Sequence, residues 1–300
     1  MTEAELHQNL SRYYHMTNIL DKLLSSIAST FPSDNRWFLY SEKIARKLLT
    51  HCKSLCLNSA DTFIYDDGTN KKQTEYMDIP GLFMNIRTQS DTYAILYHLF
   101  FDNVDWELKR LRFDLWRIDS LVTWLKQKNF LDNQIEEQQI RDIQETILNN
   151  IEYKKLNEPQ KRFVFIPNND LYKIFSNWKF IPEKLNTKQE SKISWKEIFI
   201  NSGLKGQIFE NAHSFFSMYV HSNFFSVNHL NNLSKEQAMI DKNFAITFSS
   251  FLIALTIDDF CSKFNPAKEL ISKLTQEEIE IINSFLVAAR EKDKIKYFIN

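Results

Sequence analysis

Glycine and proline are scarce in this chain, which has four glycines and six prolines among its 300 residues. Sheet-rich folds use glycine in hairpin turns, and nucleotide-binding folds use it in the loops that cradle phosphates. The sequence contains no GxGxxG and no GxxxxGK[ST] motif, so neither phosphate-binding mechanism is supported. This composition favours an all-α protein, a multi-helix bundle with a small β-hairpin at most.

A strong net charge and a disulfide framework are also missing. The formal net charge is -1, so no global basic field would gather nucleic acid. The densest basic run, Lys109-Arg110-Leu111-Arg112, is typical of a solvated helix face. The three cysteines, Cys52, Cys56 and Cys261, are too few for a disulfide framework, and we expect free thiols.

No long hydrophobic run marks a membrane span. The most apolar stretch, residues 244–257, is shorter than the roughly 20 apolar residues that cross a bilayer, and it predicts a buried core helix. The N-terminal residues Met1-Thr-Glu-Ala-Glu5 are acidic and lack the apolar core of a signal peptide. We therefore expect a cytoplasmic protein that does not contact a membrane, and no motif calls for a cofactor or a metal.

Helix-start signals recur along the chain. In a capping box, a hydroxyl and an acid or amide three residues later satisfy exposed amide groups reciprocally; the fitting segments are Thr2–Glu5, Ser194–Glu197, Ser234–Gln237 and Thr275–Glu278. Apolar spacing predicts eight or more helices, including ones over residues 36–57, 81–102, 105–131 and 140–151. The turn signal Asp66-Asp67-Gly68 predicts a hairpin within residues 62–76, and residues 163–167 predict a short extended segment.

The domain organisation predicted from these patterns is one main body with an addition at each end. We expect an N-terminal helix in residues 1–35 and a main helical domain in residues 36–263. Within that domain, residues 157–192 form an irregular insertion. A C-terminal helix in residues 264–300 would pack on the main domain.

Two of the predicted helices carry a polar stripe among apolar neighbours. Steps of three, four or seven residues place side chains on one helix face. The first stripe consists of Glu210, Ser214, Ser217 and His221, and the second of Arg87, Asp91 and His98. Polar groups are costly to bury unless they meet partners, so we predict that the two stripes meet in one polar site.

The order of these motifs resembles a widespread bacterial all-helical domain of unknown function, whose members show Arg-x-x-x-Glu early and Tyr-x-x-x-Ser-x-x-x-His late. The resemblance covers about residues 36–223. It rests on the order of a helix over Ser41–Leu55, then Arg87-x-x-x-Asp91, then Ser217-x-x-x-His221. Asp91 replaces the usual Glu, and His213 stands where Tyr is usual. More distantly, the pattern is similar to HEPN domains, helical bundles often found in bacterial RNases and phage-defence systems.

HEPN domains typically have an Arg and a His four to six residues apart, and Arg46 and His51 fit that spacing. A five-residue step turns an α-helix so that the two side chains point about 140° apart. We interpret this match as chance, with a surface Arg and a His at the edge of the core.

If the stripes form a catalytic site, the chemistry that fits best is metal-independent cleavage of RNA. His221 would transfer protons near neutral pH, and Arg87 would stabilise charge on the phosphate. Asp91 would orient one of them, supported by Ser217, His98, Glu210 and Ser214. A metal bound by His98, Asp91 and His221 is a weaker interpretation, because their spacing matches no known signature.

The alternative from another class is a non-enzymatic interaction, regulatory or immunity protein, in which the polar stripes fix helix register. Arg87 and Asp91 would then form an intrahelical ion pair, and His221 would cap a helix end. The partner is RNA in the first hypothesis and another protein or a second copy of the chain in the alternative.

Overall fold

The computed structural model describes residues 2–28, 37–59, 62–66, 71–75, 78–127, 137–181, 193–204, 207–221 and 224–290. For residues 62–66, 71–75, 196, 207–210, 213, 224–225 and 231, the description covers the backbone alone. These ranges contain thirteen α-helices and two short two-stranded antiparallel sheets. The predicted all-α class is therefore confirmed.

The contacts divide the chain into two compact units, Met1–Tyr97 with Phe199–Asn300 (unit 1) and His98–Ile198 (unit 2). The helices and strands of unit 1 are α1 (Glu3–Ala28), α2 (Leu39–Asn58), β1 (Thr62–Asp66), β2 (Lys71–Glu75), α3 (Ile79–Leu96), α9 (Gln207–Val220), α10 (Phe224–Asn231), α11 (Lys235–Lys263), α12 (Asn265–Ile271) and α13 (Gln276–Arg290). The boundaries between the units fall after residues 97 and 198, whereas the sequence patterns predicted boundaries near residues 35 and 263.

Unit 2 begins within a π-helical turn, Tyr97–Phe101, that follows α3 in the chain. Its elements are α4 (Trp106–Gln127), α5 (Glu137–Asn149), α6 (Ile151–Lys155), α7 (Glu158–Val164), β3 (Phe165–Ile166), a 3-10 turn (Leu171–Lys173) and β4 (Phe175–Ser176). The helix α8 (Trp195–Asn201) contains the boundary between the units. The insertion predicted to be irregular thus holds a capped helix, α7, and the part of it at residues 182–192 lies outside the described residues.

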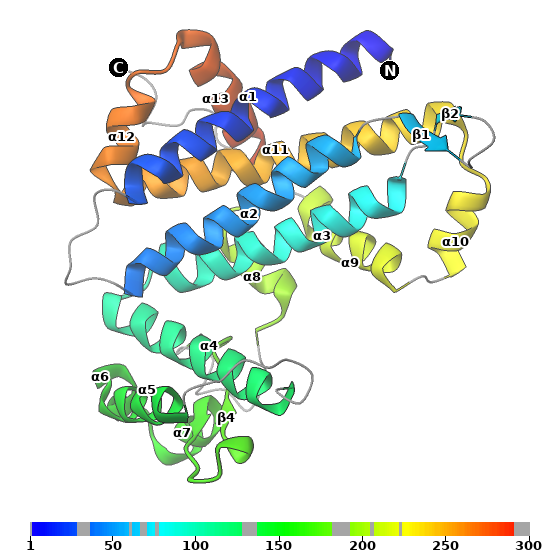
Figure 1. The fold of residues 1–300 in the computed structure, drawn as a ribbon. Helices are drawn as coiled ribbons and strands as arrows, with labels where there is room; N and C mark the ends of the chain where they lie inside the picture. Colours follow the sequence, from blue (N-terminus) through cyan, green and yellow to red (C-terminus); the bar gives the residue numbers. More distant parts are fainter. Residues whose placement is uncertain are drawn as a thin grey trace. The chain divides into compact units, whose positions relative to one another are not determined.

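Unit 1 is built on a bundle of α1, α2, α3 and α11, in which each helix packs against the next around a ring. Figure 1 shows these four helices running side by side. The helix α11 is buried on nearly all sides between Leu252 and Cys261, as expected of a helix at the centre of a core. Residues 244–257 are therefore part of a core helix, as predicted.

The helix α11 is longer than the apolar stretch from which it was predicted. By length and composition it is a candidate membrane span, but 83% of its most apolar 18-residue window is buried inside the structure. A helix at the centre of a protein core passes the same test, so this feature alone is weak support for a membrane.

A buried polar network joins the four helices of the bundle, one side chain from each. The Tyr13 hydroxyl lies 3.0 Å from the Cys52 carbonyl oxygen and 2.8 Å from Ser249 Oγ. Ser249 donates to Gln89 Oε1, which also accepts from the Cys52 thiol at 3.6 Å. Burial raises the pKa of Cys52 to about 12, so the thiol stays protonated and can donate. The network fixes the register of the four helices because each polar group has one position that satisfies it.

Replacing Tyr13 with phenylalanine should lower the free energy of unfolding by about 1–2 kcal/mol, because the Cys52 carbonyl and Ser249 each lose a buried hydrogen-bond partner. Urea denaturation measures the change. Tyr14→Phe on the same helix is the matched control, since Tyr14 is 57% exposed, and it should shift stability by less than about 0.5 kcal/mol. Equal effects of the two substitutions would contradict a structural role for the network.

Three of the four predicted capping boxes form completely, and the fourth forms in part. The reciprocal bonds are present at Thr2 and Glu5, at Ser194 and Glu197, and at Thr275 and Glu278. Ser234 accepts from the Gln237 amide, but the Gln237 side chain donates to Asp241 instead. A capping box of Asn157 and Gln160 starts α7; it was not predicted, because its first residue carries an amide and not a hydroxyl.

The predicted hairpin is present, with Thr62 opposite Glu75 and Asp66 opposite Lys71. Its turn, residues 67–70, lies outside the described residues. The extended segment predicted at residues 163–167 is only β3, which pairs with β4. A second antiparallel pair therefore exists beyond the single hairpin expected.

The basic run on α4 was interpreted wrongly as a solvated face. Lys109 is 7% exposed and Arg112 is fully buried. Arg112 donates to Asp102 Oδ2 at 2.6 Å and to the carbonyl oxygens of His98 and Phe180, both at 3.2 Å. Partners distant in sequence allow this charge to be buried, and the local charge pattern cannot reveal them.

Candidate functional site

Aromatic packing brings α3 and α9 of unit 1 together. The ring of Phe83 on α3 lies 5.3, 5.7 and 4.6 Å from the rings of Phe215, Phe216 and Tyr219 on α9. The helix α3 starts at Asp78, whose carboxylate accepts from the Gly81 amide. Residues four apart share a helix face, so Arg87, one turn after Phe83, is directed at α9.

Arg87 joins the two polar stripes. Its Nε donates to Ser217 Oγ at 2.9 Å, and its Nη1 forms an ion pair with Asp91 one turn along α3. The Arg87 side chain is 16% exposed and that of Asp91 is 32% exposed, so the cluster lies at the edge of the core with access to solvent. The structure thus brings together three of the candidate residues, Arg87, Asp91 and Ser217.

His221 lies one helical turn beyond Ser217. It follows the last residue of α9, is exposed, and its amide donates to the Ser217 carbonyl at 3.1 Å. Within the described part of the chain, no hydrogen bond joins its imidazole to Arg87 or Asp91. Ser214, on the preceding turn of α9, is also exposed. The side chains of Glu210 and His213 lie outside the described residues.

His98 belongs to a different environment. It is 3% exposed, and its Nε2 lies 3.3 Å from the Trp178 carbonyl oxygen in unit 2. Burial, with the nearby Arg112 charge, lowers the pKa of His98 well below its usual value, so the ring is neutral and donates to that carbonyl. The π-helical turn at Tyr97–Phe101 changes the helical phase that the predicted stripe assumed.

The geometry of the described residues does not support a metal site formed by His98, Asp91 and His221. The part of the chain that the structure describes has no group of three His, Cys, Asp or Glu side chains that could bind a metal ion. Nothing described therefore arranges His98, Asp91 and His221 around one ion.

Arg46 and His51 on α2 do not form a shared site in the described residues. Arg46 forms ion pairs with Glu42 and with Asp21, and its side chain is 41% exposed. Burial, with the charge of Lys47, lowers the pKa of His51. Each residue has its own surroundings, as the five-residue step suggested.

A second polar cluster in unit 1 was missed from the sequence. Tyr219 on α9 is hydrogen bonded to Nδ1 of His229 on α10, and His229 Nε2 lies 3.3 Å from Asp241 Oδ2 on α11. Burial raises the pKa of Tyr219 to about 12, with the Asp241 charge contributing, so the phenol stays protonated. These contacts link α9, α10 and α11 and hold the C-terminal turn of α9. Tyr219 lies on that turn, two residues before His221. Its spacings match no motif, so the sequence carried no signal for it.

The chain matches no protein-family model, no curated protein and no solved structure in the comparisons made with each.

Proposed function

We propose that this protein is a HEPN-like, metal-independent endoribonuclease whose site lies where α3 meets α9. The observation that carries the proposal is the hydrogen bond from Arg87 Nε to Ser217 Oγ. It joins residues 130 positions apart and places a guanidinium beside the turn that leads to His221. In this proposal the enzyme acts on cellular RNA in the cytoplasm, as part of a bacterial defence or toxin system.

The chemistry assigned to the site is transfer of the phosphodiester to the neighbouring 2′-hydroxyl. His221 takes the proton of the 2′-hydroxyl, the 2′-oxygen bonds to phosphorus, and the 5′-oxygen leaves with a proton from the imidazolium or water. Products are a 2′,3′-cyclic phosphate and a 5′-hydroxyl. The exposed position of His221 gives an RNA strand access to its ring.

Arg87 would stabilise the negative charge that grows on the phosphoryl oxygens. A guanidinium has five N–H donors, and Ser217 and Asp91 engage Nε and Nη1. No described residue is a hydrogen-bond partner of Nη2, which leaves its donors for a phosphate. Asp91 orients the guanidinium through the ion pair.

The alternative is a non-enzymatic interaction or regulatory protein, and the paired state of Arg87 favours it. An Arg that satisfies Ser217 and Asp91 also serves to fix the register of α3 against α9. In that case the substitutions below would affect stability and leave no activity to lose.

The expected result of the decisive assay is cleavage of single-stranded RNA by the purified protein in the presence of EDTA. His221→Ala should abolish cleavage by removing the proton carrier, and Arg87→Ala should slow it by roughly 10² or more, as loss of a charge stabiliser does. His7→Ala is the matched control, because His7 is exposed on α1. A substrate with one 2′-deoxy nucleotide should resist cleavage after that nucleotide.

Three outcomes would contradict the proposal in different ways. Loss of cleavage on adding EDTA would favour a metal-dependent reaction. Cleavage after the 2′-deoxy nucleotide would rule out attack by the 2′-hydroxyl. Absence of cleavage and of cellular toxicity, with variants that merely lower the melting temperature, would support the interaction protein.

A further inference from the structure

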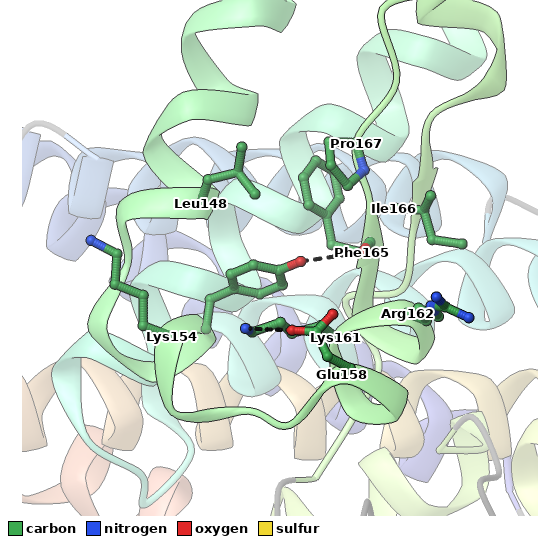
Figure 2. A pocket seen from close by; sticks show the side chains of 9 residues that line it. Leu148, Lys154, Glu158, Lys161, Arg162, Phe165, Ile166 and Pro167 are labelled. Carbon is green, nitrogen blue, oxygen red and sulfur yellow. Dashed lines mark hydrogen bonds and ion pairs between the residues drawn. The ribbon is translucent and has the colours of Figure 1, made fainter.

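Unit 2 contains a cavity of about 430 Å³ that shares no lining residue with the α3–α9 site. It is bounded by the end of α5, by α6 and α7, and by β3. Figure 2 shows Lys154 and Arg162 at opposite sides of the view, with the ion pair of Glu158 and Lys161 between them. Its volume lies within the range of about 300–1,000 Å³ usual for small-molecule sites.

One part of the cavity lining is aromatic and held in place. Tyr153 and Phe165 are 6% and 1% exposed, and their rings pack edge to face with centroids 6.1 Å apart. The Tyr153 hydroxyl donates to the Phe165 carbonyl oxygen at 3.3 Å. The polar end of the phenol is therefore satisfied within the protein, and the two rings form a closed floor with little exposed surface. Leu148 and Ile166, which also line it, are 39% and 42% exposed.

The charged part of the lining is predominantly basic. Lys154, Lys161 and Arg162 supply three positive charges and Glu158 one negative charge, which leaves a net charge of +2. The Glu158 side chain is 76% exposed, so solvent screens its ion pair with Lys161 at 3.0 Å. A phosphate monoester carries about -1.5 to -2 charges at pH 7 and has three strong acceptor oxygens. Its charge and acceptors complement these donors.

We propose that this cavity binds a phosphate monoester attached to an aromatic group, with a nucleoside monophosphate as the occupant. Lys161 and Arg162, both on α7, bind the phosphate, because a charged donor and a charged acceptor make the stronger hydrogen bonds. The base lies against the exposed apolar side chains of Leu148 and Ile166, which leave water on contact with it. The volume and the apolar lining exceed what inorganic phosphate would use, so the ring contributes to recognition. This site goes beyond the proposed ribonuclease activity and does not depend on it.

Calorimetric titration of the full chain with adenosine 5′-monophosphate tests the proposal, with adenosine and inorganic phosphate as separate arms. We expect the monophosphate to bind at least about tenfold more tightly than either fragment, since each fragment keeps one half of the contacts. Lys161→Gln and Arg162→Gln should each weaken binding roughly tenfold. Leu148→Trp should weaken it as well, by filling the apolar side of the cavity.

The matched control is Lys173→Gln, which removes the same charge from the same unit. The Lys173 side chain is 72% exposed, forms an ion pair with Asp170, and does not line the cavity. This variant should bind the monophosphate like the wild type. Equal affinity for inorganic phosphate and the monophosphate would overturn the proposal, as would an absence of binding up to about 1 mM ligand. Binding that Lys161→Gln and Arg162→Gln leave unchanged would overturn it too, because the ligand would then occupy another place.

Discussion

Replacing Arg112 with methionine is expected to lower the free energy of unfolding by about 3–5 kcal/mol, as breaking a buried charge pair does. Arg112 is fully buried in unit 2, and its guanidinium binds Asp102 and the carbonyl oxygens of His98 and Phe180. Methionine matches much of the volume but leaves these acceptors without their donor. The Asp102 side chain is 21% exposed, so water would recover part of the loss.

Arg112→Lys distinguishes charge from geometry. An ammonium is a compact charge without the planar fork of a guanidinium, and it would not satisfy all three acceptors. We expect a loss of about 1–3 kcal/mol, because buried acceptors remain unpaired. The control is Lys126→Met on the same helix, where the side chain is exposed and the change should stay within about 0.5 kcal/mol.

A double-mutant cycle with Asp102→Asn completes this test. Removing the carboxylate charge along with Arg112 should cost less than the sum of the two single substitutions, because no charge is left without its counterion. Urea denaturation measures each free energy of unfolding. Additive losses, or a neutral effect of Arg112→Met, would show that the buried guanidinium contributes nothing beyond its volume.

Features that depend on neighbours along the chain were predictable from the sequence. The reciprocal bonds of Thr275 and Glu278 involve residues three apart, and a capping box forms wherever such residues start a helix. The hairpin of β1 and β2 is likewise a local structure with its own turn signal. Helix periodicity then fixes which face is apolar, and the all-α class follows from these local patterns.

Features that depend on distant backbone groups were not predictable. The partner of His98 is the Trp178 carbonyl, and every residue has a carbonyl, so no side-chain pattern marks that contact. Arg112 was predicted to be a surface charge for the same reason, because two of its partners are the backbone carbonyls of His98 and Phe180. The contact of Arg87 with Ser217 could be predicted from the sequence, because a polar stripe on an apolar helix requires a partner. The complementary stripe was visible in the sequence of α9. Tyr219, His229 and Asp241 come from three helices, and only their packing brings them together.

The second large effect is expected where α11 meets α13 in unit 1. Arg290 forms ion pairs with Asp258 and, at 3.1 Å, with Asp259. The two carboxylate side chains are 3% and 7% exposed, and Tyr93 donates to Asp259 at 3.0 Å. Arg290→Met should therefore destabilise the protein by about 3–5 kcal/mol at pH 8, because two buried carboxylates lose their cation. The exposed Lys263→Met on α11 is the control, with a change within about 0.5 kcal/mol.

The pH dependence of stability should identify Asp259 in this cluster. Burial raises the pKa of Asp259 to about 7, with Asp258 adding to the rise and Arg290 opposing it. The pKa of an aspartate in the unfolded chain is about 3.9. Between about pH 4 and pH 7 the folded state therefore holds a proton that the unfolded state has lost, so the free energy of unfolding falls as pH rises through this window. Above pH 7 this contribution no longer changes.

Asp259→Asn removes the titration and keeps the size of the side chain. Its single amide oxygen can accept from only one of the two donors, Tyr93 and Arg290, which bind different oxygens of Asp259. The free energy of unfolding of the wild type, measured relative to this variant, should decrease by on the order of 2–4 kcal/mol from pH 4 to pH 8. In Arg290→Met, the loss should be smaller at pH 5 than at pH 8, because protonation of Asp259 removes one of the unpaired charges. Urea denaturation at several pH values provides both comparisons. A wild-type difference that stays flat, or rises with pH, would show that Asp259 is ionised in the folded protein across this range and that Arg290 outweighs its burial.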